Sequence, residues 1–409
     1  MAAEILDREL EQLIGDDGFK VPGLGVIIFK RGAEVYSKFL GQRTIHPPRP
    51  VTRRTKFRAA SLSKMFTVFS LMQLVERGKL NLDNDVSDCL GFELRNPNHP
   101  QKKITARMLA SHTSSLRDGK IYSTPPDVSV KEFFRRGGKF WENGAHFAEE
   151  PPEKFFCYSN LNYGLLGTMI ERVTGQRFDI FQRENILTQL DMRADYVPSN
   201  LPPEEFELLG AIYRKKNSAG VWDEFGEWFA QIDDFKAQPP AETLTLQNPY
   251  AENFCRDFSL SDYRIGTNAT IFSPQGGLRI SFEELAHVLE MFAGGGKFRG
   301  KKFLNKTSLD EMFTAQWIFD GTNGDTCGGA MLNYGLGVYS VAEKFFGHTG
   351  VAFGLLGGLF FDPTTKDGFA YMMNGEALEE DVDPRSLGRA GDNYIWEEKI
   401  WDAVRNFRR

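Results

Sequence analysis

Ser61 and Lys64 have the residue types and the spacing that a nucleophile and its base require. They begin and end the segment Ser61-Leu62-Ser63-Lys64, and residues three apart on a helix share a face, so the hydroxyl and the amine can hydrogen-bond. A serine hydroxyl becomes nucleophilic when a base takes its proton. A lysine becomes such a base when burial lowers its pKa from about 10.4. The N-terminus of the helix would add partial positive charge where an oxyanion forms.

A second candidate segment is Tyr158-Ser159-Asn160. A tyrosine beside a lysine cation should have its phenolate form favoured, so Tyr158 could exchange protons with the nucleophile and with the leaving group. Asn160, two residues later, could position a substrate amide. The segment is predicted to be a loop that leads into a helix over about residues 161–173.

A third candidate segment is Gly347-His348-Thr349-Gly350, expected at the edge between two strands. Glycine beside a polar pair on a strand lets a substrate backbone come close. The backbone N–H of Val351, which follows, could complete an oxyanion hole with the N–H of Ser61.

Each segment has a plainer interpretation when it is taken alone. Ser61 could be only a helix N-cap, Tyr158 could be only a packing residue, and residues 347–350 could form an ordinary β-turn. Ser63 is a competing hydroxyl, but it is offset from Lys64 by one residue, so the two side chains should diverge. The three segments together are far more specific than any one of them.

The elements that must position these residues are visible in the hydrophobic pattern. Apolar residues at helical spacing predict a largely buried helix over residues 61–77. Residues 23–29 and 33–40 read as a hairpin, and residues 334–341, 344–348, 353–361 and 368–373 as four further strands. Amphipathic helices are expected at the N-terminus, over residues 283–292, and at the C-terminus.

This order predicts an α+β fold in which both ends of the chain build one antiparallel sheet flanked by helices. The sheet domain would comprise residues 1–84 and 266–409. A mostly helical inserted domain would cover residues 85–265, and its irregular, aromatic 200–260 segment would be an insertion or lid, or a plain surface excursion.

Composition excludes several functional classes. The 409 residues include 49 Lys+Arg and 55 Asp+Glu, a net charge of −6, which argues against nucleic-acid binding because that role leaves a basic footprint. Four well-separated cysteines without a CxxC pair indicate neither a structural zinc site nor a disulfide framework. No stretch approaches the roughly 18 apolar residues of a membrane span, and the acidic N-terminus is unlike a signal peptide, so a cytoplasmic location is expected.

The sequence contains no complete cofactor-binding motif, and neither a cofactor nor a metal is expected. The run Ala293-Gly294-Gly295-Gly296-Lys297 resembles a phosphate loop but is followed by Phe298 rather than Ser or Thr. It is interpreted as a helix C-cap and a hairpin turn. The sequence has no HExxH zinc helix and no GxSxG nucleophile elbow.

Taken together, the motifs resemble those of the serine β-lactamase-like and penicillin-binding-protein-like hydrolases, closest to the class C β-lactamase, DD-peptidase, D-aminopeptidase and esterase branch. The similar segments are Pro22-Gly23, the nucleophile motif over residues 57–64, Leu109-Ala110-Ser111-His112-Thr113-Ser114, Tyr158-Ser159-Asn160, Gly276-Gly277-Leu278 and His348-Thr349-Gly350. The resemblance spans about residues 20–375 and fails over about 200–260. In the similar segment His112 lies at a helix end, so it is interpreted as structural.

The resemblance implies an acyl-enzyme route on ester or amide bonds of a small molecule or D-peptide. Ser61 would attack the carbonyl, Lys64 and Tyr158 would share general base and acid duty, and Asn160 would orient the substrate. Water or an alcohol would release the acyl group. The alternative function is a class C-like β-lactamase or a DD-carboxypeptidase (penicillin-binding protein), and a third hypothesis is a scaffold without activity.

One departure from the family pattern bears on the substrate. His348 stands where β-lactamases usually place a lysine that binds the substrate carboxylate. An ordinary imidazole titrates near about pH 6.5 and is mostly neutral above it, so it would bind a carboxylate more weakly. Ester or D-amino-acid amide hydrolysis is therefore favoured over antibiotic hydrolysis, and the expected cytoplasmic location agrees with this preference.

Overall fold

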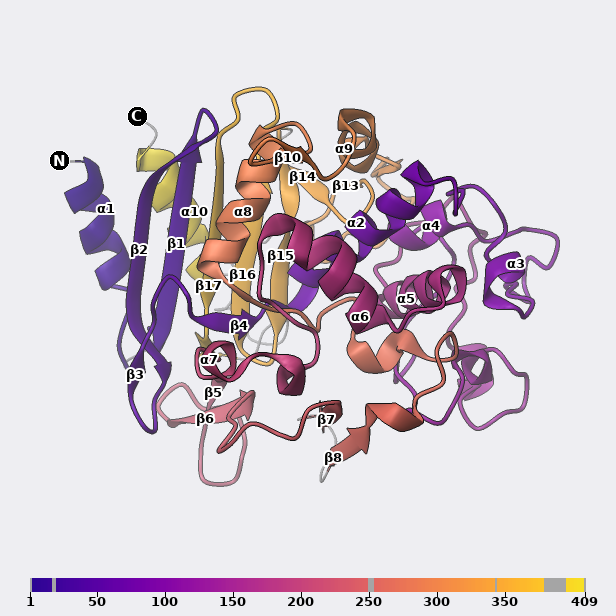
Figure 1. Cartoon of the computed structure of the whole chain (residues 1–409), viewed down its shortest axis with the longest axis horizontal. Coiled ribbons are helices and arrows are strands. Elements are labelled where there is room, and N and C mark those ends of the chain that lie inside the picture. The colour runs from indigo at the N-terminus through magenta and orange to yellow at the C-terminus, as the bar shows by residue number, and fades with distance from the viewer. Residues whose placement is uncertain (1, 17–19, 249–253, 343, 379–394, 408–409) are drawn as a thin grey trace.

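Seven antiparallel strands form the central sheet of the protein (Figure 1), in the order β14-β15-β16-β17-β1-β2-β3. The computed structural model describes residues 2–16, 20–248, 254–342, 344–378 and 395–407. The sheet strands are β1 (Gly23–Lys30), β2 (Ala33–Thr44), β3 (Arg49–Pro50), β14 (Tyr339–Val341), β15 (Phe345–Ala352), β16 (Leu355–Phe361) and β17 (Gly368–Met373). Because β1 pairs with β17, strands from the two ends of the sequence meet at its centre.

Helices cover both faces of this sheet. On one face lie α1 (Ala2–Glu11) and α10 (Ile395–Phe407), and on the other lies α8 (Phe282–Ala293) (Figure 1). Side chains alternate between the faces along β1, so Val26 and Ile28 pack with α1 and α10 while Ile27 and Phe29 pack on the α8 side. Burial on both faces explains why β1 is a nearly continuous apolar run. The predicted α+β architecture is confirmed.

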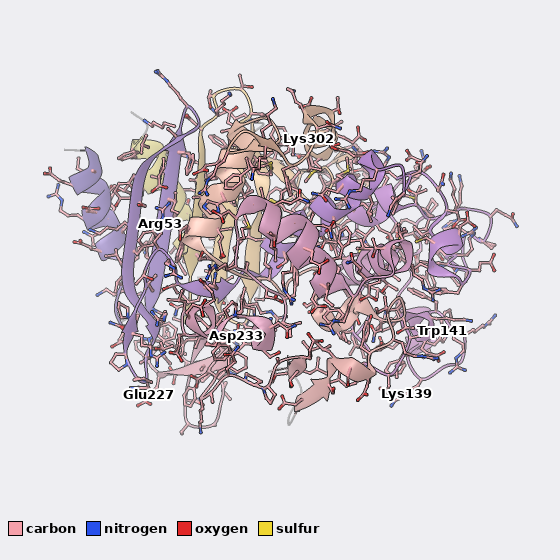
Figure 2. The ribbon with its side chains drawn as sticks, in the orientation of Figure 1. Arg53, Lys139, Trp141, Glu227, Asp233 and Lys302 are labelled. Atoms are coloured by element: carbon pink, nitrogen blue, oxygen red, sulfur yellow. The ribbon has the colours of Figure 1, made fainter. Side chains whose placement is uncertain are left out.

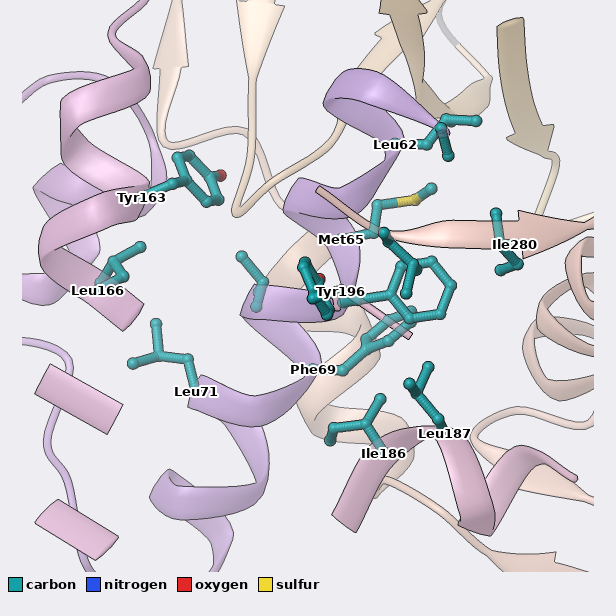
Figure 3. Packing of buried hydrophobic residues seen from close by; sticks show 14 of the residues in the cluster. Leu62, Met65, Phe69, Leu71, Tyr163, Leu166, Ile186, Leu187, Tyr196 and Ile280 are labelled. Carbon is teal, nitrogen blue, oxygen red and sulfur yellow. The ribbon is translucent and has the colours of Figure 1, made fainter. Parts of the chain in front are cut away.

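Helix α2 (Ser63–Glu76) lies between the sheet and the helical part of the molecule. Its residues are buried on almost every side: Leu62 and Met65 pack near Ile280, and Leu71 faces Leu166 (Figure 3). The buried cluster is continuous from the sheet to these helices. The start of α2 is therefore held rigidly by packing.

The middle of the chain contains short helices and long loops. The helices are α3 (Val86–Leu90), α4 (Ala106–Ala110), α5 (Asn160–Thr174), α6 (Phe178–Gln182) and α7 (Pro203–Phe206).

Small two-stranded sheets lie outside the central sheet. Strand β4 (Lys56–Arg58) pairs with β9 (Arg279–Ser281), β10 (Lys297–Phe298) pairs with β11 (Lys301–Lys302), and β12 (Trp317–Ile318) pairs with β13 (Asn333–Tyr334). Helix α9 spans Lys306–Phe313. Within the described ranges, no helix combines the length and apolar character that crossing a bilayer would need.

The 200–260 segment, expected as an insertion or lid, contains two hairpins. They are β5 (Ile212–Lys216) with β6 (Glu227–Ile232), and β7 (Thr243–Asn248) with β8 (Phe254–Ser259). Strand β5 also pairs in parallel with β18 (Gly375–Glu376), close to the end of β17. The segment is anchored to β9 as well, because Arg279 forms a buried ion pair with Asp233 at 2.8 Å. Figure 2 labels Asp233, which directly follows β6.

Several strand boundaries differ from the sequence-based expectation. The run expected as one strand over residues 334–341 forms two short strands, β13 and β14, and β2 extends beyond residue 40 to Thr44. The strand expected to end at His348 continues to Ala352, and the next begins at Leu355. The intervening Phe353 and Gly354 have φ of 61° and 99°, the geometry of a two-residue hairpin turn. The segment from Gly347 to Gly350 therefore lies inside β15 rather than between two strands. The glycine run after Ala293 ends the helix as predicted, and the predicted hairpin follows, with Arg299 and Gly300 at its turn.

Candidate active site

Ser61 lies in a single 3-10 turn, Ala60–Leu62, directly before α2, rather than within the helix itself. The preceding Ala60 has a φ of 47°, a strained conformation of the kind that clusters at functional sites. Leu278 supports the turn from outside: its carbonyl accepts from the N–H of Ala59 at 2.8 Å, and its N–H donates to Ser63 Oγ at 3.1 Å. The competing hydroxyl of Ser63 is thus used structurally.

Lys64 is completely buried and reaches Ser61. Its Nζ lies 3.0 Å from Ser61 Oγ, 2.9 Å from Asn160 Oδ1 and 3.4 Å from the carbonyl oxygen of Gln275. The residue has 0% exposure. Burial lowers the pKa of Lys64 to about 7, against the opposing influence of Asp118. The amine is therefore substantially neutral at neutral pH, as a base for Ser61 must be.

Tyr158 also contacts Ser61 and lies beside Lys64. Its hydroxyl donates to Ser61 Oγ at 2.9 Å, and Lys64 Nζ lies 4.6 Å from the centre of its ring. Burial raises the pKa of Tyr158 well above its ordinary value. The expectation that Lys64 would favour the phenolate is therefore wrong, because loss of solvation outweighs the attraction of a lysine that is itself only partly charged. Tyr158 is protonated and acts as a donor.

Asn160 begins α5, and its amide joins Lys64 to a carboxylate that the sequence analysis missed. Its Nδ2 donates to Asp118 Oδ2 at 2.9 Å, while Ser159 Oγ and the N–H of Leu161 each donate to Asp118 Oδ1 at 2.9 Å. Asp118 lies in a loop, outside any periodic pattern. The one available sequence signal was its position shortly after the His112 segment.

His112, two residues after the end of α4, supports the segment that leads into α5. Its Nδ1 accepts from the N–H of Ser159 at 3.1 Å, and its ring lies 4.4 Å from that of Tyr158, measured between centres. Burial lowers the pKa of His112 well below 6.5, so the ring is neutral. Its contacts hold the segment that carries Tyr158 and Asn160 in place.

Strand β15 passes close to the Ala60–Leu62 turn that carries Ser61. A Cβ on Gly350 would lie 2.4 Å from the carbonyl oxygen of Ala59, so only glycine permits this approach. Pairing in an antiparallel hairpin alternates between hydrogen-bonded and free pairs. Since the two-residue turn closes between Ala352 and Leu355, the N–H of Val351 points away from β16. Thr349 Oγ1 accepts from the hydroxyl of Tyr339 at 3.2 Å.

His348 is buried on this strand, with 1% exposure. Its Nδ1 lies 2.5 Å from the carbonyl oxygen of Thr349 and its Nε2 lies 2.9 Å from the hydroxyl of Tyr334. A carbonyl only accepts, so Nδ1 carries the proton and Nε2 accepts from Tyr334. Burial, together with the nearby Lys64, lowers the pKa of His348 to about 3. His348 thus contributes no positive charge near neutral pH.

The structure brings together the residues singled out in the sequence. Ser61, Lys64, Tyr158 and Asn160 form one hydrogen-bonded chain, and β15 carries His348, Thr349, Gly350 and Val351 past it. Across the parts of the chain that are described, no group of three or more His, Cys, Asp or Glu side chains is arranged to hold a metal ion.

Comparison with known proteins identifies the family. The Beta-lactamase family model matches residues 10–391, so this chain belongs to the beta-lactamase family, a family of hydrolases. Protein flp of Staphylococcus aureus (strain MRSA252) is 27% identical over 229 residues, which cover 54% of this chain and 44% of that protein. The chain thus spans less than half the length of this curated relative.

Two further proteins match over most of this chain. The N-acetylmuramyl-L-alanine amidase of Bacillus subtilis (strain 168) is 25% identical over 84% of this chain and 76% of its own length. The solved structure of EstCE1, described as a hydrolase with promiscuous acyltransferase activity, superposes with a TM-score of 0.65 at 20% identity and covers 98% of each chain. The structural likeness confirms the fold.

Proposed function

We propose that this protein is a serine hydrolase that forms an acyl-enzyme at Ser61, acting on ester or amide bonds of small molecules. One observation carries the proposal: Ser61 Oγ lies within hydrogen-bond distance of the fully buried Lys64 amine and of the Tyr158 hydroxyl. Acyl transfer needs a base to take the proton of the attacking hydroxyl and an acid to protonate the leaving group. The Lys64 amine, with a pKa near neutrality, and the protonated Tyr158 phenol could supply these two roles beside Ser61.

In the first step, Ser61 Oγ attacks the substrate carbonyl and its proton passes to the neutral amine of Lys64. The carbonyl oxygen becomes an oxyanion, and the N–H groups of Ser61 and Val351 stabilise it. The direction of the Val351 N–H, away from β16, supports this role. Thr349 and Gly350 would line the same edge of the substrate, and Asn160 would help to orient it.

In the second step, the leaving group takes the proton of the Tyr158 hydroxyl, and Tyr158 regains a proton from the Lys64 ammonium. This order follows from the two pKa directions, since Tyr158 is a donor and Lys64 an acceptor near neutral pH. The bond from the carbonyl carbon to the leaving group breaks and the ester to Ser61 remains. Water then reverses the sequence and releases the acid, while an alcohol would accept the acyl group instead.

The substrate class follows from His348. A neutral, buried imidazole whose two nitrogens are already bonded offers no cation to a substrate carboxylate. Neutral esters and amides, including D-amino-acid amides, are therefore preferred over β-lactams and carboxylate-terminated peptides. The amidase and the hydrolase among the similar proteins support acyl chemistry in general. The alternative is a class C-like β-lactamase or a DD-carboxypeptidase.

The nucleophile is tested with a fluorophosphonate probe and mass spectrometry of the labelled peptide. We expect labelling of Ser61 in the unaltered protein, none in Ser61→Ala, and persistent labelling in Ser63→Ala, whose hydroxyl bonds to Leu278. A folded protein that is not labelled would rule out the serine mechanism.

The substrate preference is tested with p-nitrophenyl butyrate, D-alanine amide and nitrocefin, each against a Ser61→Ala background. We expect turnover of the neutral ester or of the amide and little turnover of nitrocefin. Efficient nitrocefin hydrolysis would instead establish the β-lactamase alternative.

A further inference from the structure

Asp118 holds the N-terminus of α5 and one end of the Asn160 side chain at the same time. Its Oδ1 accepts from Ser159 Oγ and from the N–H of Leu161, and its Oδ2 accepts from Asn160 Nδ2, all at 2.9 Å. A carboxylate is well placed at a helix N-terminus, where backbone N–H groups lack partners. The contact with Asn160 goes beyond capping, since it reaches the residue that touches Lys64.

This contact determines which way the Asn160 amide faces. An ionised carboxylate only accepts hydrogen bonds, so the amide must turn Nδ2 toward Asp118. Oδ1 is then directed at Lys64 Nζ, 2.9 Å away. Without Asp118 the amide could turn over and present N–H groups to Lys64 instead.

The direction of Asn160 Oδ1 in turn determines how Lys64 can act. A neutral lysine amine has two N–H groups and one lone pair. Asn160 Oδ1 and the carbonyl oxygen of Gln275, at 2.9 and 3.4 Å, accept the two N–H groups. The lone pair is left for the third neighbour, Ser61 Oγ at 3.0 Å.

We propose that Asp118 is a positioning residue for the reaction at Ser61: by holding the Asn160 amide in one orientation, it directs the lone pair of Lys64 toward the nucleophile. The inference rests on the proposed function, because it assigns Asp118 a part in the same proton transfer. Asp118 touches neither the substrate nor the reacting atoms, and it acts through Asn160.

The charge of Asp118 adds an effect that can be measured. The titratable groups that face Lys64 from the surrounding elements are Asp118, His112, Tyr158, Tyr163, His348 and Cys327. Among them, Asp118 and, less strongly, Cys327 oppose burial by favouring the ammonium form. Removing its charge should lower the pKa of Lys64 further and shift the acid side of the pH–rate profile downward.

The test is the pH dependence of acylation by p-nitrophenyl butyrate, followed in a stopped-flow instrument. In Asp118→Asn, the new Nδ2 meets Asn160 Nδ2, so the Asn160 amide must turn over and face Lys64 with its donors. We expect the plateau of the acylation rate to be at least about tenfold lower than in wild type. The acid limb of the pH–rate profile should shift down by about one pH unit, because a tenfold stabilisation of the neutral Lys64 amine lowers its pKa by that amount. Ser159→Ala removes one bond to the same carboxylate but keeps its charge, and its acid limb should remain at the wild-type pH.

A reciprocal exchange tests the same inference if Asp118→Asn fails to fold. In Asp118→Asn/Asn160→Asp, the amide introduced at position 118 would accept from the N–H of Leu161 and donate to the carboxylate introduced at position 160, so each donor again meets an acceptor. That carboxylate would contact Lys64 directly and favour its ammonium form. The acid limb of the pH–rate profile should therefore move to a higher pH than in wild type. If wild-type protein is acylated while Asp118→Asn has an unchanged profile, or the exchanged pair moves the limb downward, the role of Asp118 is refuted. Absence of wild-type acylation would refute the proposed function itself.

Discussion

The hydroxyl of Tyr334 lies 2.9 Å from Nε2 of the buried His348 and donates to it. The other ring nitrogen donates to the carbonyl oxygen of Thr349, so both nitrogens of the neutral ring have partners. Protonation would turn Nε2 into a donor, and the Tyr334 hydroxyl would have to accept instead of donating. Burial, with the nearby Lys64, lowers the pKa of His348 to about 3, so this position of β15 is uncharged near neutral pH.

The first prediction concerns substrate charge. The ratio of kcat/KM for a carboxylate-bearing p-nitrophenyl ester to that for a neutral one should stay constant from about pH 5.5 to 8. The reason is that the pKa of His348, lowered to about 3 by burial, leaves it neutral throughout this range. Paired steady-state assays at each pH measure the ratio. A ratio that falls as the pH rises through about 6.5 would show a titrating, cationic His348.

The second prediction concerns the base. The single-turnover acylation rate should rise about tenfold per pH unit at acid pH and level off near the Lys64 pKa of about 7. Tyr158 should produce no decline up to about pH 10, because burial raises its pKa well above that value. Stopped-flow acylation by a neutral ester gives the profile. A plateau that begins only above about pH 9 would mean that Lys64 keeps an ordinary pKa.

The third prediction concerns stability. Lys64→Met should abolish acylation and raise the free energy of unfolding by about 1–3 kcal/mol at pH 7, since a buried ionisable group is replaced by an apolar one of similar size. The folded pKa of Lys64, about 7, lies below its unfolded value. The unfolded state therefore binds the extra proton between about pH 7 and 10.5, and wild-type stability from this group rises across that range.

The stability gap between Lys64→Met and wild type should accordingly be largest at and below about pH 7 and should shrink toward about pH 10. Urea unfolding at several pH values measures it. Lys306→Met is the control, because Lys306 is exposed and pairs with Asp310 on its own helix, and its effect should stay within about 0.5 kcal/mol. A gap that widens with pH would contradict the burial argument.

The fourth prediction concerns the contact between β15 and the Ala60–Leu62 turn that carries Ser61. Gly350→Ala should reduce kcat by at least about tenfold, because the new methyl group would lie 2.4 Å from the carbonyl oxygen of Ala59 and push Ser61 away from β15. Gly276→Ala is the control: its methyl group would meet nothing nearer than 3.7 Å. Ester turnover and the melting temperature are measured for both variants, so that displacement of Ser61 can be distinguished from loss of folding. If Gly350→Ala were as active as Gly276→Ala, the close approach of β15 to Ala59 would not be needed for activity.

Much of this arrangement could be predicted from the sequence because it follows from periodicity. The apolar run of β1 and the buried face of α2 marked the elements that carry or support the site. Ser61 and Lys64 are three residues apart, so local helix geometry alone brings their side chains together. The parallel pairing of β5 with β18 was not visible, since it joins residues far apart along the chain and β6 leaves most of its side chains exposed or half-buried.

The features that sequence reasoning missed depend on burial and on distant partners. The protonated state of Tyr158 is set by the side chains packed around it, and no motif records them. Asp118 is a single acidic residue in a loop, and its importance appears only when Asn160 and Leu161 fold against it. The length of β15 was misjudged because the break between the two strands was expected over residues 349–352, whereas the chain turns at Phe353 and Gly354.

The pairing of β1 with β17, with Leu24 opposite Met373, also constrains when the protein can become active. During synthesis, the hairpin of β1 and β2 leaves the ribosome long before its central partner exists. Until β17 arrives, one edge of β1 stays open and apolar, and such edges invite aggregation. The chain must therefore complete its sheet late, through contacts of high sequence separation, which slow folding. A nascent or prematurely ended chain that stops before β17 would carry Ser61 and Lys64 without the strand that joins β16 to β1 in the central sheet.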